Sequence, residues 1–152
     1  MDEADLLFQL DGDADVMKYI TLGIPRTMDE VIEKSMPRVL QSYQDKTDFG
    51  IFAAYLINSE KYIGWFQFEE DKEFEHSIEI GWRLKKQYWG NGYATEVATV
   101  LCDLGIKMGK TIVARAMIEN LASIRVMEKA GLKFEKKFWC PHFSSPDVLY
   151  KR

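Results

Sequence analysis

The spacing of hydrophobic and polar positions alternates along the chain between helical and strand-like periods. In residues 27–44, Val31, Ile32, Val39 and Leu40 recur near the helical period, which predicts a helix. Thr27 and Glu30 have the spacing of a capping box at its start, and Pro37 is expected to kink or split it. The opening segment DEADLLFQL predicts a shorter helix that ends near Asp11 and Gly12.

The middle of the chain has the spacing of β-strands. Residues 49–57, 61–68 and 75–84 are rich in aromatic and β-branched side chains and are separated by polar turns, which predicts three antiparallel strands. Apolar and polar residues alternate in the third segment. Glu79 is therefore expected on the opposite face from Ile78 and Ile80.

Helical spacing returns at residues 92–108, where the predicted apolar face comprises Tyr93, Val97, Val100, Leu101, Leu104 and Met108. Residues 120–131 predict a short helix, and three further strands are predicted at 111–118, 132–139 and 147–152. The order α, α, β, β, β, α, β, α, β, β predicts an α+β domain in which strands 75–84 and 111–118 run parallel. Ligands usually bind at the carboxyl ends of such a pair.

The chain length and the net charge limit the range of possible functions. A chain of 152 residues fits one domain, 1–152, and its net charge of −4 argues against nucleic-acid binding and suits a cationic partner. The chain has two cysteines and two histidines, Cys102, Cys140, His76 and His142. They do not have the spacing of a metal site, so no metal is expected. The sequence has no signal-like start and no membrane-length apolar run, which predicts a cytoplasmic protein.

The segment QYWGNG (Gln87–Gly92) lies between the third strand and the main helix. Amides from about Asn91 to Ala94 lack partners inside the helix, and together with the helix dipole they predict a site for phosphate or pyrophosphate. The pattern GxxxxGK[ST] is absent, and Thr95 breaks GxGxxG. A plain glycine turn that binds nothing is the alternative, and GxG alone does not separate the two.

Two motifs resemble those of the GCN5-related N-acetyltransferases (GNAT). Gln87, Gly90 and Gly92 match the acetyl-CoA signature [QR]xxGx[GA], and IEIGWRLKKQYWGNGYATEV is similar to the branch with ribosomal-protein N-terminal and spermidine acetyltransferases. That branch's segment NxxSxxVxEKxGF is matched by Asn120, Ser123, Val126, Glu128, Lys129, Gly131 and Phe134. The resemblance runs from about residue 20 to the C-terminus. It implies a mixed, mostly antiparallel sheet flanked by helices, with the parallel pair at the acetyl-CoA crevice.

The resemblance implies acetyl-CoA as co-substrate, with no metal. The pyrophosphate is expected on the backbone of Gln87, Tyr88, Trp89, Gly90, Asn91, Gly92, Tyr93 and Ala94. The pantetheine arm is expected to pair, like an added strand, with the backbone near Ile80, Trp82 and Leu84. Asn120 is expected to bind CoA or a buried backbone group.

Direct acetylation of an amine requires a proton acceptor and a group that protonates the leaving thiolate. Glu79 is the first candidate for the base, acting through water; the alternatives are an ordinary exposed glutamate or one that orients the amine. Met127 stands near the tyrosine that serves as acid in many relatives, and methionine cannot donate a proton. Ser123 is the substitute that this branch suggests, with a helix N-cap as the alternative. His76 is interpreted as a surface histidine.

The acceptor site is less defined. An acidic run could attract a cationic amine, although a solvated turn is the simpler interpretation; it comprises Glu69, Glu70, Asp71, Glu73 and Glu75. Several aromatic residues could line the pocket or belong to the core: Tyr55, Trp65, Phe66, Tyr88 and Trp89. The family's first strand has no counterpart, which would leave a sheet edge that a homodimer partner could cover.

The sequence thus predicts a cytoplasmic, acetyl-CoA-dependent N-acetyltransferase that transfers acetyl directly to a primary amine. The acceptor would be a protein N-terminus, a polyamine or another small amine. A non-catalytic acyl-CoA-binding or regulatory module is the main alternative, and a binding protein for another phosphorylated ligand is a second.

Overall fold

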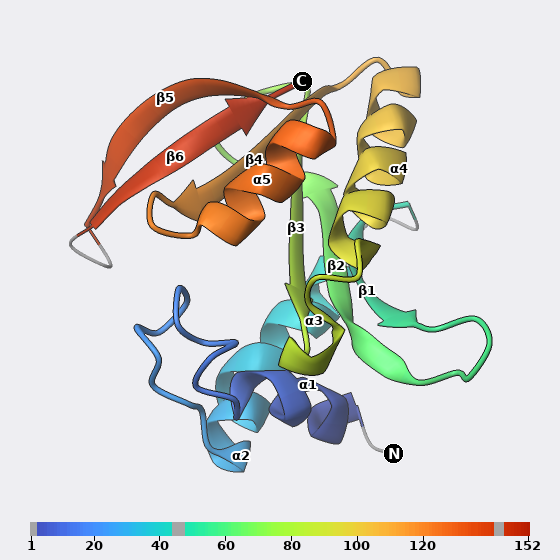
Figure 1. The fold of residues 1–152 in the computed structure, drawn as a ribbon, viewed down its shortest axis with the longest axis vertical. Helices are drawn as coiled ribbons and strands as arrows, with labels where there is room; N and C mark the ends of the chain where they lie inside the picture. The colour runs from blue at the N-terminus through green and yellow to red at the C-terminus, as the bar shows by residue number, and fades with distance from the viewer. Residues whose placement is uncertain (1–2, 44–47, 142–144) are drawn as a thin grey trace. The chain divides into compact units, whose positions relative to one another are not determined.

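The computed structural model of the protein describes residues 3–43, 48–141 and 145–152 (Figure 1). The helical elements are α1 (Glu3–Asp11), α2 (Met28–Glu30), the π-helix η1 (Val31–Ser35), α3 (Met36–Ser42), the 3-10 helix η2 (Lys86–Tyr88), α4 (Tyr93–Lys107) and α5 (Leu121–Lys129). The strands are β1 (Gly50–Tyr55), β2 (Tyr62–Glu70), β3 (Ser77–Leu84), β4 (Thr111–Met117), β5 (Lys133–Cys140) and β6 (Ser145–Lys151). The predicted α+β class and element order are confirmed.

The six strands form one sheet in the order β1-β2-β3-β4-β6-β5, so β1 ends the sheet on one side. β3 and β4 are parallel, as predicted, and β6 is antiparallel to both β4 and β5. The chain divides into two compact units, one of Met1–Gln67 with Trp82–Asn91 and one of Phe68–Gly81 with Gly92–Arg152. No helix in the described part of the chain is long and apolar enough to cross a bilayer.

Local signals explain the helices of the first unit. Thr27 caps α2 by accepting from the backbone N–H of Glu30 at 3.2 Å, and the Glu30 side chain accepts from the N–H of Thr27 at 3.1 Å. The capping box is therefore confirmed. Pro37 lies in the first turn of α3, directly after the wider turns of η1, so the predicted split is also confirmed.

The first unit also contains a buried charged cluster around Asp11, which the sequence suggested only as a helix break. Its side chain is fully buried, and it accepts hydrogen bonds from Arg26 at 3.1 Å, from Arg83 and from the Ser35 hydroxyl. Burial lowers the pKa of Arg83, although the charge of Asp11 opposes that shift. The cluster joins the end of α1 to β3.

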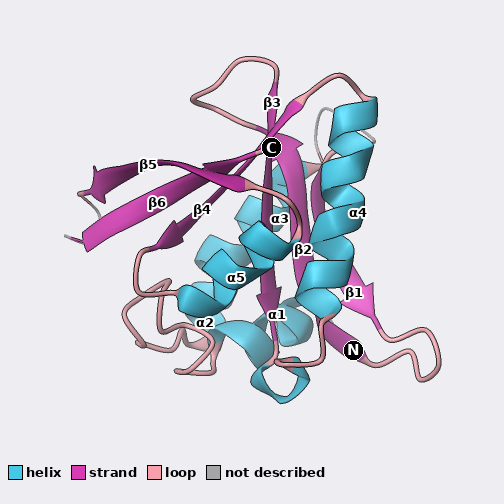
Figure 2. Cartoon of the chain, turned by 45° about the horizontal axis from the view of Figure 1, so that its top comes forward, coloured by secondary structure: helices cyan, strands magenta, loops and turns pink. Residues whose placement is uncertain are grey.

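In the second unit, α4 and α5 pack against each other and against β4 (Figure 2). The predicted apolar face of α4 is only partly correct, because Val100 and Leu104 are 61% and 45% exposed and Met108, just beyond the helix, is 39% exposed. The buried residues of α4 are instead Ala98, Cys102 and Gly105. A β-carbon at Gly105 would lie 2.2 Å from Cδ1 of Ile112, so small residues let the helix approach the sheet closely.

Candidate active site

The segment after β3 forms a turn held by its own side chains. The indole N–H of Trp89 donates to the carbonyl of Leu84 at 2.8 Å. The amide of Asn91 donates to the carbonyls of Tyr88 and Trp89 at 3.2 and 3.1 Å. These bonds hold the backbone of the turn between Leu84 and Asn91.

Two glycines end this turn. Gly90 and Gly92 have φ values of +77° and +85°, which favour glycine, and a β-carbon at either position would meet no atom within 4 Å. Gly92 is the N-cap of α4 without a side-chain cap, and the helical bonding begins with Glu96 N–H donating to Gly92 O at 2.9 Å. The N–H groups before Glu96 have no acceptor inside the helix. With the dipole of a 15-residue helix, they form a suitable site for an anionic group.

The strand before the turn begins as the parallel partner of β4. The pairs between them are Ser77–Thr111, Ile78–Ile112 and Glu79–Val113 within the described chain. β3 continues to Leu84, and Ile80 follows directly after the last pair. Ile80 and Leu84 are buried and Trp82 is half-buried.

Glu79 is neither fully exposed nor isolated. Its side chain is 31% exposed, and its Oε1 accepts a hydrogen bond from Nη1 of Arg115 at 2.8 Å. Arg115 also binds Asp71 and Glu73. Burial alone would lower the pKa of Arg115, but the bonds and charges of Asp71 and Glu79 outweigh it and raise the pKa above its usual value. The sequence reasoning missed Arg115.

The start of α5 gives Asn120 and Ser123 different roles. Asn120 is the N-cap, and its Oδ1 accepts from the backbone N–H of Ser123 at 3.2 Å. The alternative in which Ser123 caps the helix is therefore wrong. Ser123 lies half-buried in the first turn, while Met127, near the tyrosine position of relatives, is buried with 1% exposure.

Burial distinguishes the remaining acidic, aromatic and histidine candidates. Asp71 was grouped with a solvated acidic turn, but its side chain is 1% exposed and bound to Arg115, so that interpretation is wrong for Asp71. Phe66 is a core residue with 3% exposure, whereas Tyr55 is 49% exposed. His76 is exposed, as expected, and His142 lies outside the described residues.

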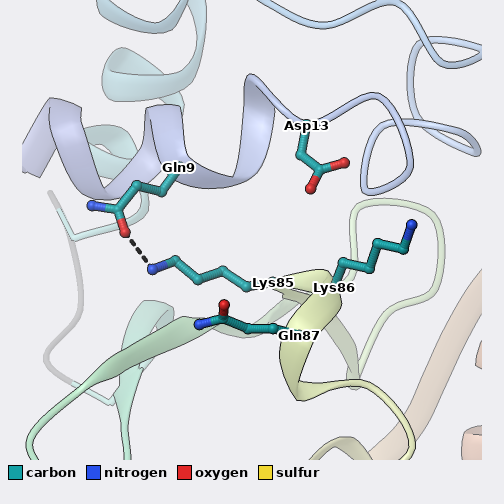
Figure 3. A pocket seen from close by; sticks show the side chains of 5 residues that line it. All are labelled: Gln9, Asp13, Lys85, Lys86 and Gln87. Atoms are coloured by element: carbon teal, nitrogen blue, oxygen red, sulfur yellow. Dashed lines mark hydrogen bonds between the residues drawn. The ribbon is translucent and has the colours of Figure 1, made fainter.

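The first unit has an open cavity of about 610 Å³ beside the turn (Figure 3). It is lined by Gln9, Asp13, Lys85, Lys86 and Gln87. Figure 3 shows the ammonium group of Lys85 directed at the side-chain carbonyl of Gln9, to which it donates, and Lys86 pairs with Asp15 at 2.6 Å. The sequence reasoning singled out Gln87 but not the two lysines, although the LKKQ run could have indicated them.

A family model, the Acetyltransferase (GNAT) domain, matches residues 1–133. The chain is a GNAT acetyltransferase. The N-acetyltransferase YnaD of Bacillus subtilis is 32% identical over 87% of this chain and 74% of its own length. A GNAT-family acetyltransferase from Bacillus anthracis superposes with a TM-score of 0.78, at 29% identity over 99% of this chain and 88% of that one. The aminoglycoside acetyltransferase AAC(6')-Ib, solved with coenzyme A and kanamycin, has the same fold, with a TM-score of 0.75 at 22% identity over 100% of this GNAT chain and 91% of its own.

These similarities confirm the predicted GNAT fold and the prediction of an acyltransferase of the N-acetyltransferase class. The finer branch assignment, to ribosomal-protein and spermidine acetyltransferases, stays a prediction.

Proposed function

We propose that this GNAT acetyltransferase transfers an acetyl group from acetyl-CoA directly to a primary amine. The observation that carries the proposal is the turn at Gly90 and Gly92, where a β-carbon at either glycine would meet no atom within 4 Å and α4 begins without a side-chain cap. A pyrophosphate suits such amides at a helix N-terminus better than a neutral ligand does. The backbone that binds it is assigned to Gln87, Tyr88, Trp89, Gly90, Asn91, Gly92, Tyr93 and Ala94.

The pantetheine arm is assigned to the backbone of β3 at Ile80, Trp82 and Leu84. The backbone of a strand suits an extended ligand that adds to it through main-chain hydrogen bonds. The carbonyl of Leu84 already accepts from the indole N–H of Trp89. The side chain of Asn120 is engaged at the cap of α5, so its contribution to CoA binding would come from its Nδ2 group.

The chemistry assigns one residue to each proton. The amine nitrogen forms a bond to the thioester carbon, the carbon–sulfur bond breaks, and the amine loses a proton. Glu79 accepts that proton through a water molecule. Ser123 donates a hydrogen bond to the sulfur as it leaves as a thiolate and gives it the hydroxyl proton, which the serine regains from solvent. No covalent acyl-enzyme is formed in this scheme.

A non-catalytic acyl-CoA-binding module is the second candidate. Met127 favours this candidate. It is buried near the position where many relatives carry the catalytic acid, and a thioether has no proton to donate. The same turn would bind CoA in both cases. Only turnover separates them.

Isothermal titration calorimetry with acetyl-CoA, CoA and ATP tests the donor site. Binding of both CoA species without ATP binding supports it, and the absence of CoA binding overturns the proposed function. Thiol release is then measured with polyamines, aminoglycosides and peptides with free N-termini. CoA binding without amine-dependent thiol release from any of them favours the non-catalytic module, and acetylated protein detected by intact mass without an amine present contradicts direct transfer.

A further inference from the structure

A network of charged side chains in the second unit converges on Arg115 of β4. Its Nη1 donates to Asp71 at 2.5 Å and to Glu79 at 2.8 Å, and its Nη2 donates to Asp71 at 3.3 Å and to Glu73 at 3.1 Å. A planar guanidinium can bridge carboxylates in this way because its donors are fixed in direction. Arg115 therefore joins the β2–β3 connection to the carboxylate of Glu79.

The register of the sheet explains why these groups meet. Glu79 is paired with Val113, and directly paired residues of neighbouring strands lie on the same face. Arg115 follows Val113 by two positions, so it shares that face. It is thus the diagonal neighbour of Glu79.

The carboxylate of Asp71 is held in place by backbone N–H groups. Its side chain is 1% exposed, and its Oδ1 accepts from the backbone N–H groups of Glu73 at 2.9 Å and Phe74 at 2.7 Å. Burial would raise the pKa of Asp71, but the bonds from Arg115 and from these two amides outweigh burial and lower it. Asp71 is therefore a charged anchor whose direction is set by the backbone.

An aromatic ring supports the same arrangement. The Arg115 guanidinium lies 5.7 Å from the ring centre of Phe74, and the ammonium groups of Lys136 and Lys151 lie 5.2 and 4.4 Å from it. Lys136 also binds Glu73 at 3.3 Å. Several weak cation–π contacts and ion pairs share these side chains, which reduces the freedom that each would otherwise have.

The network also changes the interpretation of the acidic run. Asp71, Glu73 and Glu79 face the positive charges of Arg115 and Lys136, so much of their charge is balanced within the protein. Attraction of a cationic amine by this turn is accordingly weak. Orientation of Glu79 is the function that the geometry supports.

We propose that Asp71 and Arg115 are positioning residues that hold the Glu79 carboxylate in the orientation needed for acyl transfer. This inference rests on the proposed function, in which Glu79 receives the amine proton. Asp71 acts through Arg115, and Arg115 acts through Glu79. Removing either should then matter only while Glu79 carries a carboxylate.

A double-mutant cycle on kcat tests this inference with the full chain and the best amine of the panel. The variants are Asp71→Asn, Arg115→Lys and Glu79→Gln, with each of the first two also combined with the third. Glu70→Gln is the matched control, because Glu70 lies one position before Asp71 and its ion-pair contact is with Lys110 at 3.9 Å. Thermal unfolding and calorimetry with acetyl-CoA accompany each variant.

We expect Asp71→Asn and Arg115→Lys each to lower kcat about tenfold while the affinity for acetyl-CoA is unchanged, because small misplacements of a reacting group carry large rate costs. In the Glu79→Gln background the same changes should have almost no further effect. Equal fold-losses in both backgrounds indicate a structural role and overturn the inference, as does an unchanged kcat. If Asp71→Asn fails to fold, Arg115→Lys carries the test alone.

These outcomes separate the two proposals. An active wild type with additive losses overturns the positioning role and leaves the proposed function intact. A wild type that binds acetyl-CoA but acetylates no amine overturns both.

Discussion

Nη1 of Arg115 donates to Oε1 of Glu79 over 2.8 Å, so the carboxylate proposed to take up the amine proton is held by a cation from the neighbouring parallel strand. The hydrogen bond fixes the direction of the carboxylate. Arg115 and Lys136 together balance much of the charge of Glu79, Asp71 and Glu73, which weakens the attraction of Glu79 for a protonated amine. The arrangement gives an oriented carboxylate, as the proposed proton transfer requires.

Replacing Glu79 by glutamine should lower kcat and leave the affinity for acetyl-CoA unchanged. Glutamine has the same shape and can still accept from Arg115, but it cannot take up a proton, and loss of a general base costs about 10²–10⁴-fold. Steady-state thiol release across a range of pH measures the effect. Glu75→Gln, an exposed glutamate shortly before the same strand, is the control and should keep the wild-type rate. A Glu79→Gln enzyme with full rate at every pH would remove Glu79 from the mechanism.

Local signals predicted most of the fold. The Thr27–Glu30 capping box, the alternation around Glu79 and the glycines before α4 each act over a few residues, and the structure has the corresponding elements. The buried face of α4 did not follow in the same way. Hydrophobicity points to Val100 and Leu104, whereas close packing against the sheet selects Ala98, Cys102 and Gly105, whose small size carries little weight in a hydrophobic pattern.

Sequence patterns could not predict that Arg115 binds Asp71 and Glu79. Arg115 lies 44 positions after Asp71 and 36 after Glu79, and only the register of β3 with β4 brings them together. Asp71 stands among charged neighbours in the sequence, so nothing in that run distinguishes a buried carboxylate from solvated ones. Its burial depends on tertiary contacts.

Replacing Gly92 by alanine should weaken acetyl-CoA binding roughly tenfold, which corresponds to about 1.4 kcal/mol. The added β-carbon would project into open space at a residue assigned to the pyrophosphate site, and the φ of +85° would strain alanine by about 1–2 kcal/mol. Calorimetry with acetyl-CoA measures the first effect and thermal unfolding the second.

Gly109→Ala is the matched control for this turn. Gly109 has a φ of +74° and open space around its α-carbon, and it follows the other end of α4. The two variants should lose similar stability, but only Gly92→Ala should lose affinity. Equal affinities in both would contradict the assignment of the pyrophosphate to the turn at Gly92.

Replacing Asp11 by alanine should lower the free energy of unfolding by about 3–5 kcal/mol, because Arg26 and Arg83 would lose the carboxylate that compensates their charges. Asp15→Ala is the comparison in the same unit. It removes an ion pair with Lys86 in which both side chains are 58% exposed, and it should cost at most about 1 kcal/mol. Urea unfolding measures both, and similar losses would show that the Asp11 cluster contributes no more than a surface pair.

Replacing Asp147 by asparagine should stabilise the protein at neutral pH. Oδ1 of Asp147 is buried and has no hydrogen-bond partner among the described residues. Burial raises the pKa of Asp147, the thiol of Cys140 partly opposes this by a hydrogen bond, and the charge of Glu119 adds to it. Asparagine removes the negative charge that burial disfavours, and recovery of about 1 kcal/mol would raise Tm by about 2–4 °C.

The stability gained by Asp147→Asn should depend on pH. Below about pH 4, the usual pKa of an unfolded aspartate, the carboxyl is protonated in both states and the variant should have no advantage. As the pH rises to the raised pKa of the folded state, ionisation increasingly favours the unfolded chain, and above that pKa the loss is complete. Thermal unfolding from acid to neutral pH should therefore show a gap between wild type and Asp147→Asn that opens as the pH rises. Asp48→Asn removes the same charge from an exposed position and should show no such gap. A gap that closes with rising pH would contradict the raised pKa of Asp147.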